Sequence, residues 1–180
     1  IMDNTTAPVL CKPLQHGAAI VVYSTTKYIG GHGTSIGGLV VDGGNFDWAK
    51  HADRFPMLNQ PDPSYHGAVW TEAVKPLGPV AYIIKARVTL QRDLGMAMSP
   101  FNAFMFINGL ETLPLRMERH SQNAMSVARY LTEHPKISWI NYPGQAGHPA
   151  YQTATKYHRN GLYGAILGFG IQGGRDAGRK

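Results

Sequence analysis

Apolar residues along the chain gather in short runs, and their spacing predicts an alternation of strands and helices. Residues 18–23 (AAIVVY) form a continuous apolar run rich in β-branched residues. This pattern is typical of a strand that is buried on both faces, as in a parallel sheet covered by helices. Asp3 follows two apolar residues and fits the end of an earlier strand. The expected strands are the end of one at 1–2, then 18–23, 36–41, 137–142 and 166–171.

Apolar positions three to four residues apart predict helices between and after these strands. In residues 81–95, Ile84 and Val88 recur at this spacing. Ser99 followed by Pro100 is a favourable helix start, because serine caps the first turn and proline is tolerated at its first position. The expected helices are a short one at 45–54 capped by Asn45, then 81–95, 103–110 and 115–133.

This order of elements predicts an α/β domain that leads through a linking helix into a smaller α+β domain. We expect residues 1–115 to be the C-terminal part of a large domain with a mainly parallel sheet. Residues 116–180 are expected to form the linking helix and the start of the small domain. The chain opens on the end of one strand and stops soon after another. We therefore expect it to be an internal piece of a longer polypeptide.

The composition excludes several classes of protein. Hydrophobic residues make up 43% and charged residues 16% of the chain, which favours a packed core over a disordered chain. The net charge is +6, but the basic residues are scattered. The densest patches, 116–120 and 175–180, are interpreted as solvated surface, and we expect no nucleic-acid partner because that needs a dense basic stripe.

The cysteine and histidine content argues against disulfide and metal chemistry. Cys11 is the single cysteine, so neither an internal disulfide nor a thiolate metal site can form, and a reducing compartment such as the cytoplasm is expected. The histidines lack the helical spacing of zinc ligands, so no metal is expected. The longest apolar run is too short to span a bilayer, so no membrane partner is expected either.

Residues 24–33 (STTKYIGGHG) place a lysine directly after three hydroxyl residues, at the end of the expected buried strand. A P-loop requires glycines before the lysine and Ser or Thr after it, and here the order is reversed. A dinucleotide-binding loop requires glycines that lead into a helix, whereas these lead into a strand. Lys27 is then either a surface charge in a polar turn or a Schiff-base lysine at the strand edge where α/β sheets bind ligands.

Three neighbouring residues favour the Schiff-base interpretation. Ser24 and Thr26 offer short hydroxyls to a phosphate while the longer Lys27 reaches an aldehyde. Asp3 lies 24 residues before Lys27 (27 − 3), about one strand–crossover–strand unit, so both open on the same edge if the two strands are parallel neighbours. A buried carboxylate there would pair with a protonated pyridine nitrogen and keep such a cofactor ring an electron sink. On spacing alone, Asp3 fits a strand-end turn equally well.

Motifs along nearly the whole chain resemble the Cys/Met-metabolism family of pyridoxal-phosphate enzymes, which has fold type I. The lysine motif is the most specific of them. Within the family, residues 30–38 (GGHGTSIGG) followed by Asp47-Trp48 look most like the O-acetylhomoserine sulfhydrylases, because cystathionine synthases and lyases usually carry Asp near Thr34-Ser35. The matching segments are 3–5 (DNT), 14–18 (LQHGA), 24–28 (STTKY), 99–103 (SPFNA), 109–117 (GLETLPLRM) and 142–144 (YPG).

The resemblance implies pyridoxal 5'-phosphate as cofactor and a role for each matching residue. Lys27 would bind the cofactor covalently and later shuttle protons, Asp3 would bind the pyridine nitrogen, and Ser24 and Thr26 would hold the phosphate. The implied reaction is γ-replacement on O-acetylhomoserine with sulfide or methanethiol, giving homocysteine or methionine plus acetate. The alternatives are a cystathionine γ-synthase or methionine γ-lyase and, in another class, an inactive structural or interaction fragment.

The resemblance further implies a homo-oligomer whose site is only partly carried by this chain. In the family, the phosphate loop, the aromatic that stacks on the ring and a Tyr/Arg pair lent to the neighbouring subunit come before the position of Asp3. The arginine that binds the substrate carboxylate comes after that of Lys180. We expect a tetramer built as a dimer of dimers with shared sites. Residues 1–180 alone should neither bind the cofactor tightly nor turn over.

Overall fold

The computed structural model describes residues 1–179, and Lys180, the last residue of the expected second domain, lies outside them. The strands are β1 (Met2–Asp3), β2 (Ile20–Ser24), β3 (Gly38–Asp42), β4 (Ile137–Asn141) and β5 (Gly168–Ile171). The helices are α1 (Pro56–Asn59), α2 (Trp70–Ala73), α3 (Ala81–Lys85), α4 (Arg92–Leu94), α5 (Pro100–Glu111), α6 (Leu113–Glu133), α7 (Tyr151–Tyr157) and α8 (Gly174–Gly178). Shorter or irregular helical turns span Pro13–His16, Thr25–Ile29, Ala49–Arg54, Pro63–Tyr65, Lys75–Leu77, Ala86–Gln91 and Arg159–Gly161.

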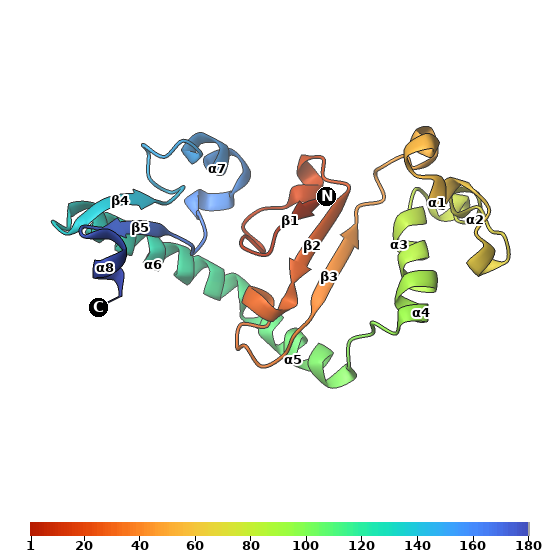
Figure 1. Ribbon diagram of the computed structural model, residues 1–180, viewed down its shortest axis with the longest axis horizontal. Helices are drawn as coiled ribbons and strands as arrows, with labels where there is room; N and C mark the ends of the chain where they lie inside the picture. Colours follow the sequence, from red (N-terminus) through yellow and green to blue (C-terminus); the bar gives the residue numbers. More distant parts are fainter. Residues whose placement is uncertain (180) are drawn as a thin grey trace.

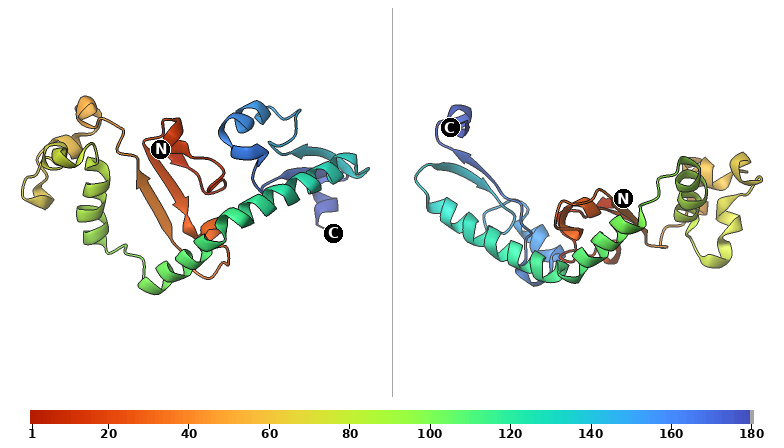
Figure 2. Two further views of the ribbon diagram at one scale, coloured as in Figure 1. Left: turned by 180° about the vertical axis from the view of Figure 1, so that it is seen from behind. Right: turned by 90° about the horizontal axis from the view of Figure 1, so that it is seen from below.

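The molecule is elongated, with three groups of elements arranged side by side (Figure 1). A sheet of β1, β2 and β3 lies in the middle, helices α1–α4 lie at one end, and the β4–β5 pair lies at the other with α7 and α8. Helix α6 runs from beside the central sheet along the β4–β5 pair, as both further views show (Figure 2). No helix within residues 1–179 is long and apolar enough to cross a membrane.

The central sheet has the order β1-β2-β3. Strands β1 and β2 are parallel, with Asp3 opposite Val22, which confirms the predicted parallel neighbours. Strand β3 is antiparallel to β2, so the sheet among the described residues is mixed and not mainly parallel. The physical reason is the connection through residues 25–37, in which a wide turn and a glycine-rich loop reverse the chain where a parallel strand would need a crossover.

The helix predictions are largely confirmed, with one error. The expected helix at 81–95 is present as α3, a wide turn and α4, and it ends at Gly95 with φ of 73°. The Ser99 hydroxyl caps α5 by accepting a hydrogen bond from the amide of Asn102 at 3.1 Å. The helix expected at 45–54 is too long, because a short 3-10 helix spans only Ala49–Arg54. The Asn45 side chain instead donates to the carbonyl of Ala18 at 3.1 Å.

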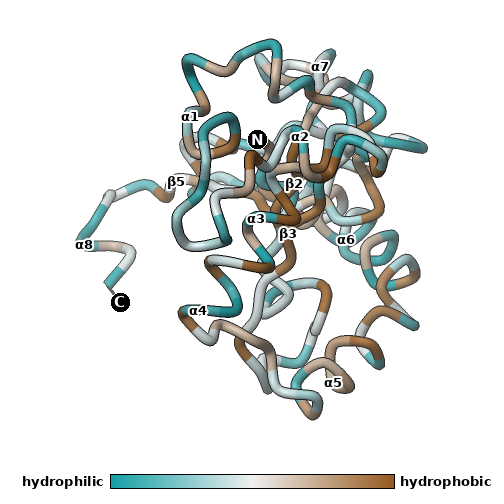
Figure 3. Tube along the Cα trace, turned by 90° about the vertical axis from the view of Figure 1, so that its right-hand side faces the viewer, coloured by the Kyte–Doolittle hydropathy of each residue, from teal (hydrophilic) through white to brown (hydrophobic). Residues whose placement is uncertain are grey.

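Three clusters of buried apolar residues hold the elements together. One packs the sheet against α1–α3 and includes Ile20 and Trp48. Met117 and Ala128, both in α6, belong to the second and third clusters respectively. Apolar positions also recur along α5 and the central strands (Figure 3). Helix α6 therefore connects the central sheet to the β4–β5 pair through its buried face.

Candidate active site

Lys27 lies on a wide helical turn directly after β2. The turn Thr25–Ile29 is closed by hydrogen bonds from the amides of Gly30 to the Thr25 carbonyl and of Gly31 to the Lys27 carbonyl, each 2.8 Å long. At Lys27 itself the backbone leaves helical geometry, with φ −90° and ψ −121°. The lysine side chain is exposed. Its amine therefore projects into solvent from a backbone segment that is held on both sides.

Gly37 fixes the turn from the other end of the glycine-rich loop. Its carbonyl accepts hydrogen bonds from the amides of Thr25 at 3.0 Å and Thr26 at 3.4 Å. The Thr26 hydroxyl accepts from the Gly37 amide at 2.9 Å and donates to the Gly37 carbonyl at 3.2 Å. A Cβ atom on Gly37 would lie 2.6 Å from the Phe106 ring. Glycine is required here because α5 and the turn approach its backbone closely.

Asp3 and Ser24 lie on one face of the sheet and are linked through Thr5. Asp3 pairs in register with Val22, and Ser24 follows two residues later, so all three side chains share that face. The Thr5 amide donates to Asp3 Oδ1 at 2.8 Å, and the Thr5 hydroxyl accepts from the Ser24 amide at 2.8 Å. Hydrogen bonding from Thr5, its hydroxyl first and its amide second, holds the pKa of the Asp3 carboxyl below its usual value.

The Asp3 side chain is exposed, and the buried carboxylate expected from the sequence is therefore wrong for the described residues. The reason is its position on β1, the edge strand of the three-stranded sheet. Asp3 still has the charge state that the hypothesis requires. A carboxyl group with a lowered pKa is ionised at neutral pH and can pair with a cation.

A pocket of about 540 Å³ opens beside Lys27. It brings together segments that are far apart in the sequence, from the loop after β1 to the segment before β5. Asp3 does not line it but lines an adjoining hollow of about 570 Å³, and Thr6 lines both. The pocket is lined by Thr5, Thr6, Lys27, Tyr28, Gly31, Gly33, Arg116, His120 and Ile166.

The predicted site residues, of which Lys27 alone lines this pocket, supply groups that a pyridoxal phosphate requires. Lys27 offers an exposed primary amine for the aldehyde, and Asp3 an ionised carboxylate for the ring nitrogen. Ser24 is half-buried, and among the described residues its bond to a side chain is made by its backbone amide, with Thr5, so its hydroxyl can donate to a phosphate oxygen. The Thr26 hydroxyl already directs its proton to Gly37 and would have to redirect it to do the same.

Arg116 is the residue of this site that the sequence did not reveal. It was interpreted as part of a solvated basic patch, but the structure shows a half-buried guanidinium. It donates to the carbonyls of Tyr28 at 2.8 Å, Ile29 at 3.4 Å and Gly109 at 2.7 Å, and to the Thr112 hydroxyl at 3.0 Å. Burial lowers the pKa of Arg116, although arginine remains charged. The one sequence signal was its place in the 109–117 segment.

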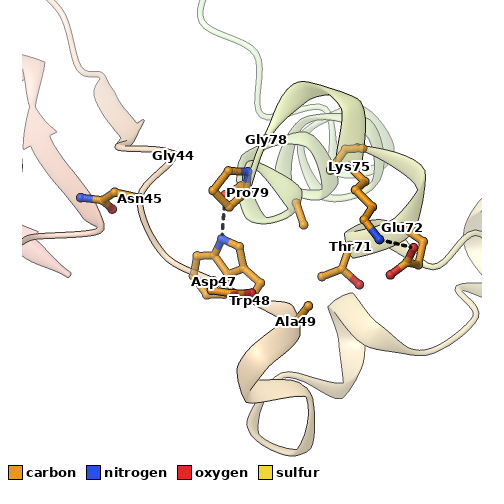
Figure 4. Close-up of a pocket in the computed structure, with 12 residues that line it drawn as sticks. Gly44, Asn45, Asp47, Trp48, Ala49, Thr71, Glu72, Lys75, Gly78 and Pro79 are labelled. Atoms are coloured by element: carbon orange, nitrogen blue, oxygen red, sulfur yellow. Dashed lines mark hydrogen bonds and ion pairs between the residues drawn. The ribbon is translucent and has the colours of Figure 1, made fainter.

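A second hollow of about 510 Å³ lies at the α1–α4 end of the molecule (Figure 4). Trp48 donates from its indole nitrogen to the Pro79 carbonyl at 3.1 Å, and the exposed Lys75 and Glu72 pair at 3.5 Å. None of the predicted site residues reaches this hollow. Residues 1–179 also contain no group of three or more His, Cys, Asp or Glu side chains placed to hold a metal ion.

The fold and the pocket beside Lys27 define an α/β protein whose candidate site is centred on a lysine. The family described as Cys/Met metabolism PLP-dependent enzyme matches residues 1–180. The chain therefore belongs to this family of pyridoxal-phosphate-dependent enzymes. The family predicted from the motifs, and the cofactor predicted with it, are confirmed.

Similar proteins narrow the comparison within the family. The chain is 54% identical to an O-acetyl-L-homoserine sulfhydrylase of Leptospira meyeri and 50% identical to a homocysteine synthase of Schizosaccharomyces pombe, in each case over 100% of this chain and 42% of the relative. The chain thus spans less than half of these relatives.

A solved structure agrees with these relatives. It is described as an O-acetylhomoserine (thiol)-lyase of Campylobacter jejuni that carries a pyridoxyl-lysine, and it matches with a TM-score of 0.85 and 38% identity. The match covers 95% of this chain and 42% of that one. The chain therefore adopts the corresponding part of a fold type I enzyme.

Proposed function

We propose that the whole protein to which this chain belongs catalyses γ-replacement on O-acetylhomoserine. Sulfide or methanethiol would replace the acetoxy group, giving homocysteine or methionine plus acetate. The observation that carries this proposal is the exposed Lys27 amine on a pocket of about 540 Å³, in a chain 54% identical over its full length to an O-acetyl-L-homoserine sulfhydrylase. The cofactor would supply the electron sink that lets protons leave the substrate carbons.

The residues of this chain would then have distinct roles. Lys27 would bind the cofactor through its amine and, once the substrate amine has replaced it, would take up and return protons at the substrate carbons. Asp3, ionised through its hydrogen bonds with Thr5, would keep the ring nitrogen protonated. Ser24 would donate to the phosphate, and Thr26 would join it after turning its hydroxyl away from Gly37.

We further propose the domain organisation and assembly that the resemblance implies. Residues 1–115 would belong to the large, cofactor-binding domain, and residues 116–180 to the linking helix and the start of the small domain. Helix α6, which contributes to two apolar clusters, supports the role of a linking helix. The remaining groups of the site would come from other parts of the polypeptide and from a neighbouring subunit in a cytoplasmic homotetramer.

Replacement of Lys27 by alanine in the whole protein tests the function. The wild type should form homocysteine from O-acetylhomoserine and sulfide and should show the visible absorbance of a lysine-linked cofactor. Lys27→Ala should lose both, whereas Lys12→Ala, which removes an exposed lysine outside the pocket, should keep both. Homocysteine formation by the Lys27 variant at the wild-type rate would reject this assignment.

Co-substrate comparison separates the alternatives that share the cofactor. A cystathionine γ-synthase would form cystathionine when cysteine replaces sulfide. A γ-lyase would release a 2-oxo acid and ammonia without any thiol. The sulfhydrylase proposal predicts that homocysteine formation with sulfide dominates over both.

A further inference from the structure

We propose that Arg116 is a positioning residue for Lys27, holding the backbone that follows the lysine and tying it to the junction of α5 and α6. The inference rests on the proposed role of Lys27 at the cofactor. It assigns Arg116 no contact with substrate or cofactor. Its effect would pass through the peptide groups between the lysine and the glycine-rich loop.

The first argument is that Arg116 supplies donors to two consecutive carbonyls directly after Lys27. The Lys27 carbonyl is bound by the Gly31 amide at 2.8 Å. The next two, those of Tyr28 and Ile29, accept from Arg116 at 2.8 and 3.4 Å. The planar guanidinium donates in a fixed fork, so it sets the orientation of both peptide groups at once. Rotation of either group would turn the backbone that carries the lysine side chain.

The second argument is that the same guanidinium is anchored on the helices. It donates to the Gly109 carbonyl at the end of α5 at 2.7 Å and to the Thr112 hydroxyl before α6 at 3.0 Å. Arg116 also leaves no room for a side chain at position 31 of the loop, since a Cβ atom on Gly31 would lie 2.8 Å from the Arg116 Nη1 atom. Arg116 therefore acts as a bridge whose two ends are the lysine turn and the α5–α6 junction.

The third argument is the close approach of α5 to the back of the lysine turn. A Cβ atom on Gly109 would overlap the carbonyl oxygens of Ile29 and Gly30. A Cβ atom on Gly30 would lie 3.0 Å from the Phe106 ring. The turn is thus pressed against α5 and held there by Arg116, while Lys27 and Arg116 line the same pocket. A small displacement of this contact moves the amine relative to the pocket.

The test compares Arg116→Gln, Arg116→Lys and Arg119→Gln in the whole protein. Arg119 is exposed on the same helix and serves as the matched control. We expect Arg116→Gln to lower kcat by about tenfold to a hundredfold, since misplacement of a reacting group by about 1 Å costs this much. The KM for O-acetylhomoserine should change less than kcat. Arg116→Lys, which keeps the charge but not the fork, should recover part of the loss, and Arg119→Gln should match the wild type.

Two readouts report the lysine itself and not turnover. In the apoprotein, amide hydrogen exchange of residues 27–33 should rise in Arg116→Gln and stay unchanged in Arg119→Gln. In the holoenzyme, the visible circular dichroism of the lysine-linked cofactor should change in amplitude, because it depends on how the bound ring is oriented. A purely structural role would lower the unfolding midpoint of Arg116→Gln while leaving kcat, exchange of 27–33 and the dichroism at wild-type values.

That last outcome would overturn the proposal, and so would equal losses in Arg116→Gln and Arg119→Gln. Failure of the proposed function has a different signature. In that case the wild type would not convert O-acetylhomoserine, yet the exchange and dichroism differences would still separate Arg116→Gln from its control. The two hypotheses can therefore fail independently.

Discussion

The hydroxyl groups of Ser24 and Thr26, which both precede Lys27, look equivalent in the sequence but differ in the structure. The Thr26 hydroxyl bonds to both backbone groups of Gly37, whereas the Ser24 hydroxyl makes no hydrogen bond to another residue among residues 1–179. Thr26→Ala leaves the Gly37 amide without its acceptor, which costs about 1–3 kcal/mol in a partly buried setting. Ser24→Ala removes no bond within the protein and should change the free energy of unfolding by about 0.5 kcal/mol or less.

Denaturant unfolding of the apoprotein measures this difference, and Thr26→Ser, which keeps the hydroxyl, is the control. In the holoenzyme both alanine variants should release the cofactor faster on dialysis if both hydroxyls reach its phosphate. Equal stability of the two alanine variants would show that the bonds between Thr26 and Gly37 contribute nothing to folding.

Residue chemistry could be predicted where it depends on local sequence. Lys27 after a buried strand and Asp3 one crossover earlier were candidates from spacing, the motif resemblance singled them out, and their roles at a cofactor stay predictions. Arg116 was missed because its four acceptors lie on two segments far apart in the sequence, and no local pattern encodes a side chain that bridges them. The exposure of Asp3 was also missed, because the order of strands in the sheet, which places β1 at its edge, is a tertiary property.

At the scale of elements, one carboxylate organises the α1–α4 group. Asp62 is buried and accepts hydrogen bonds from the Trp70 indole at 2.7 Å and from the Ser64 amide and hydroxyl at 2.9 and 2.6 Å. It also pairs with Lys85 of α3. Lys85 first, and then Ser64 and Trp70, hold the pKa of Asp62 well below its usual range. Asp62 thereby joins the loop before α2 to α3.

The lowered pKa of Asp62 predicts an acid-sensitive contribution to stability. A carboxyl group whose pKa is lower in the folded state stabilises the protein above its unfolded pKa of about 4, and this contribution declines as the pH falls below that value. Asp62→Asn should therefore lower the unfolding temperature at pH 7, and the difference from wild type should shrink between pH 4 and pH 3. Exposed Asp53→Asn is the control. A difference that stays constant across this range would contradict the assignment.

The packing of α5 on the lysine turn gives a second prediction at this scale. Gly109→Ala would place a methyl group against the carbonyl oxygens of Ile29 and Gly30, so the helix or the turn must move. Such overpacking typically costs about 1–3 kcal/mol. Gly147→Ala is the matched control, because a Cβ atom there meets open space. Denaturant unfolding should separate the two variants, and equal stability would mean that α5 does not press on the turn.

The pattern of apolar residues predicted which segments form strands and helices, but it did not predict the direction of the strands or the irregular turns. The apolar runs located all five strands to within a few residues, and Ser99-Pro100 located the start of α5. The antiparallel direction of β3 was missed because it is decided by how residues 25–37 fold back on Gly37. The helix at 45–54 was predicted too long, because Asn45 bonds to the Ala18 carbonyl and the helix begins only at Ala49.

At the scale of the whole molecule, the described chain exposes a large apolar surface. On α5, Phe101 is 70%, Ile107 59% and Phe104 55% exposed, and Figure 3 shows the apolar positions along this helix. On β3, Leu39 and Val40 are also exposed. Large apolar side chains exposed together on one helix mark a contact with further protein. The chain also spans 42% of the relatives it matches, and we propose that the rest of such a polypeptide or another subunit covers this surface.

This exposure predicts how a polypeptide of residues 1–180 behaves alone. It should bind a hydrophobic dye and self-associate in analytical ultracentrifugation. The double variant Phe101→Ser and Ile107→Ser should reduce both effects, because burying polar side chains does not give the free-energy gain of burying apolar ones. It should also lack homocysteine formation, since Lys27 lines a pocket that is open to solvent, and Asp3 and Ser24 lie outside that pocket. Turnover by residues 1–180 at a rate close to that of the whole protein would mean that these groups suffice for catalysis. A polypeptide that is inactive but monomeric and that binds no dye would contradict the first prediction alone. The site would then be incomplete, while the apolar face of α5 would need no partner.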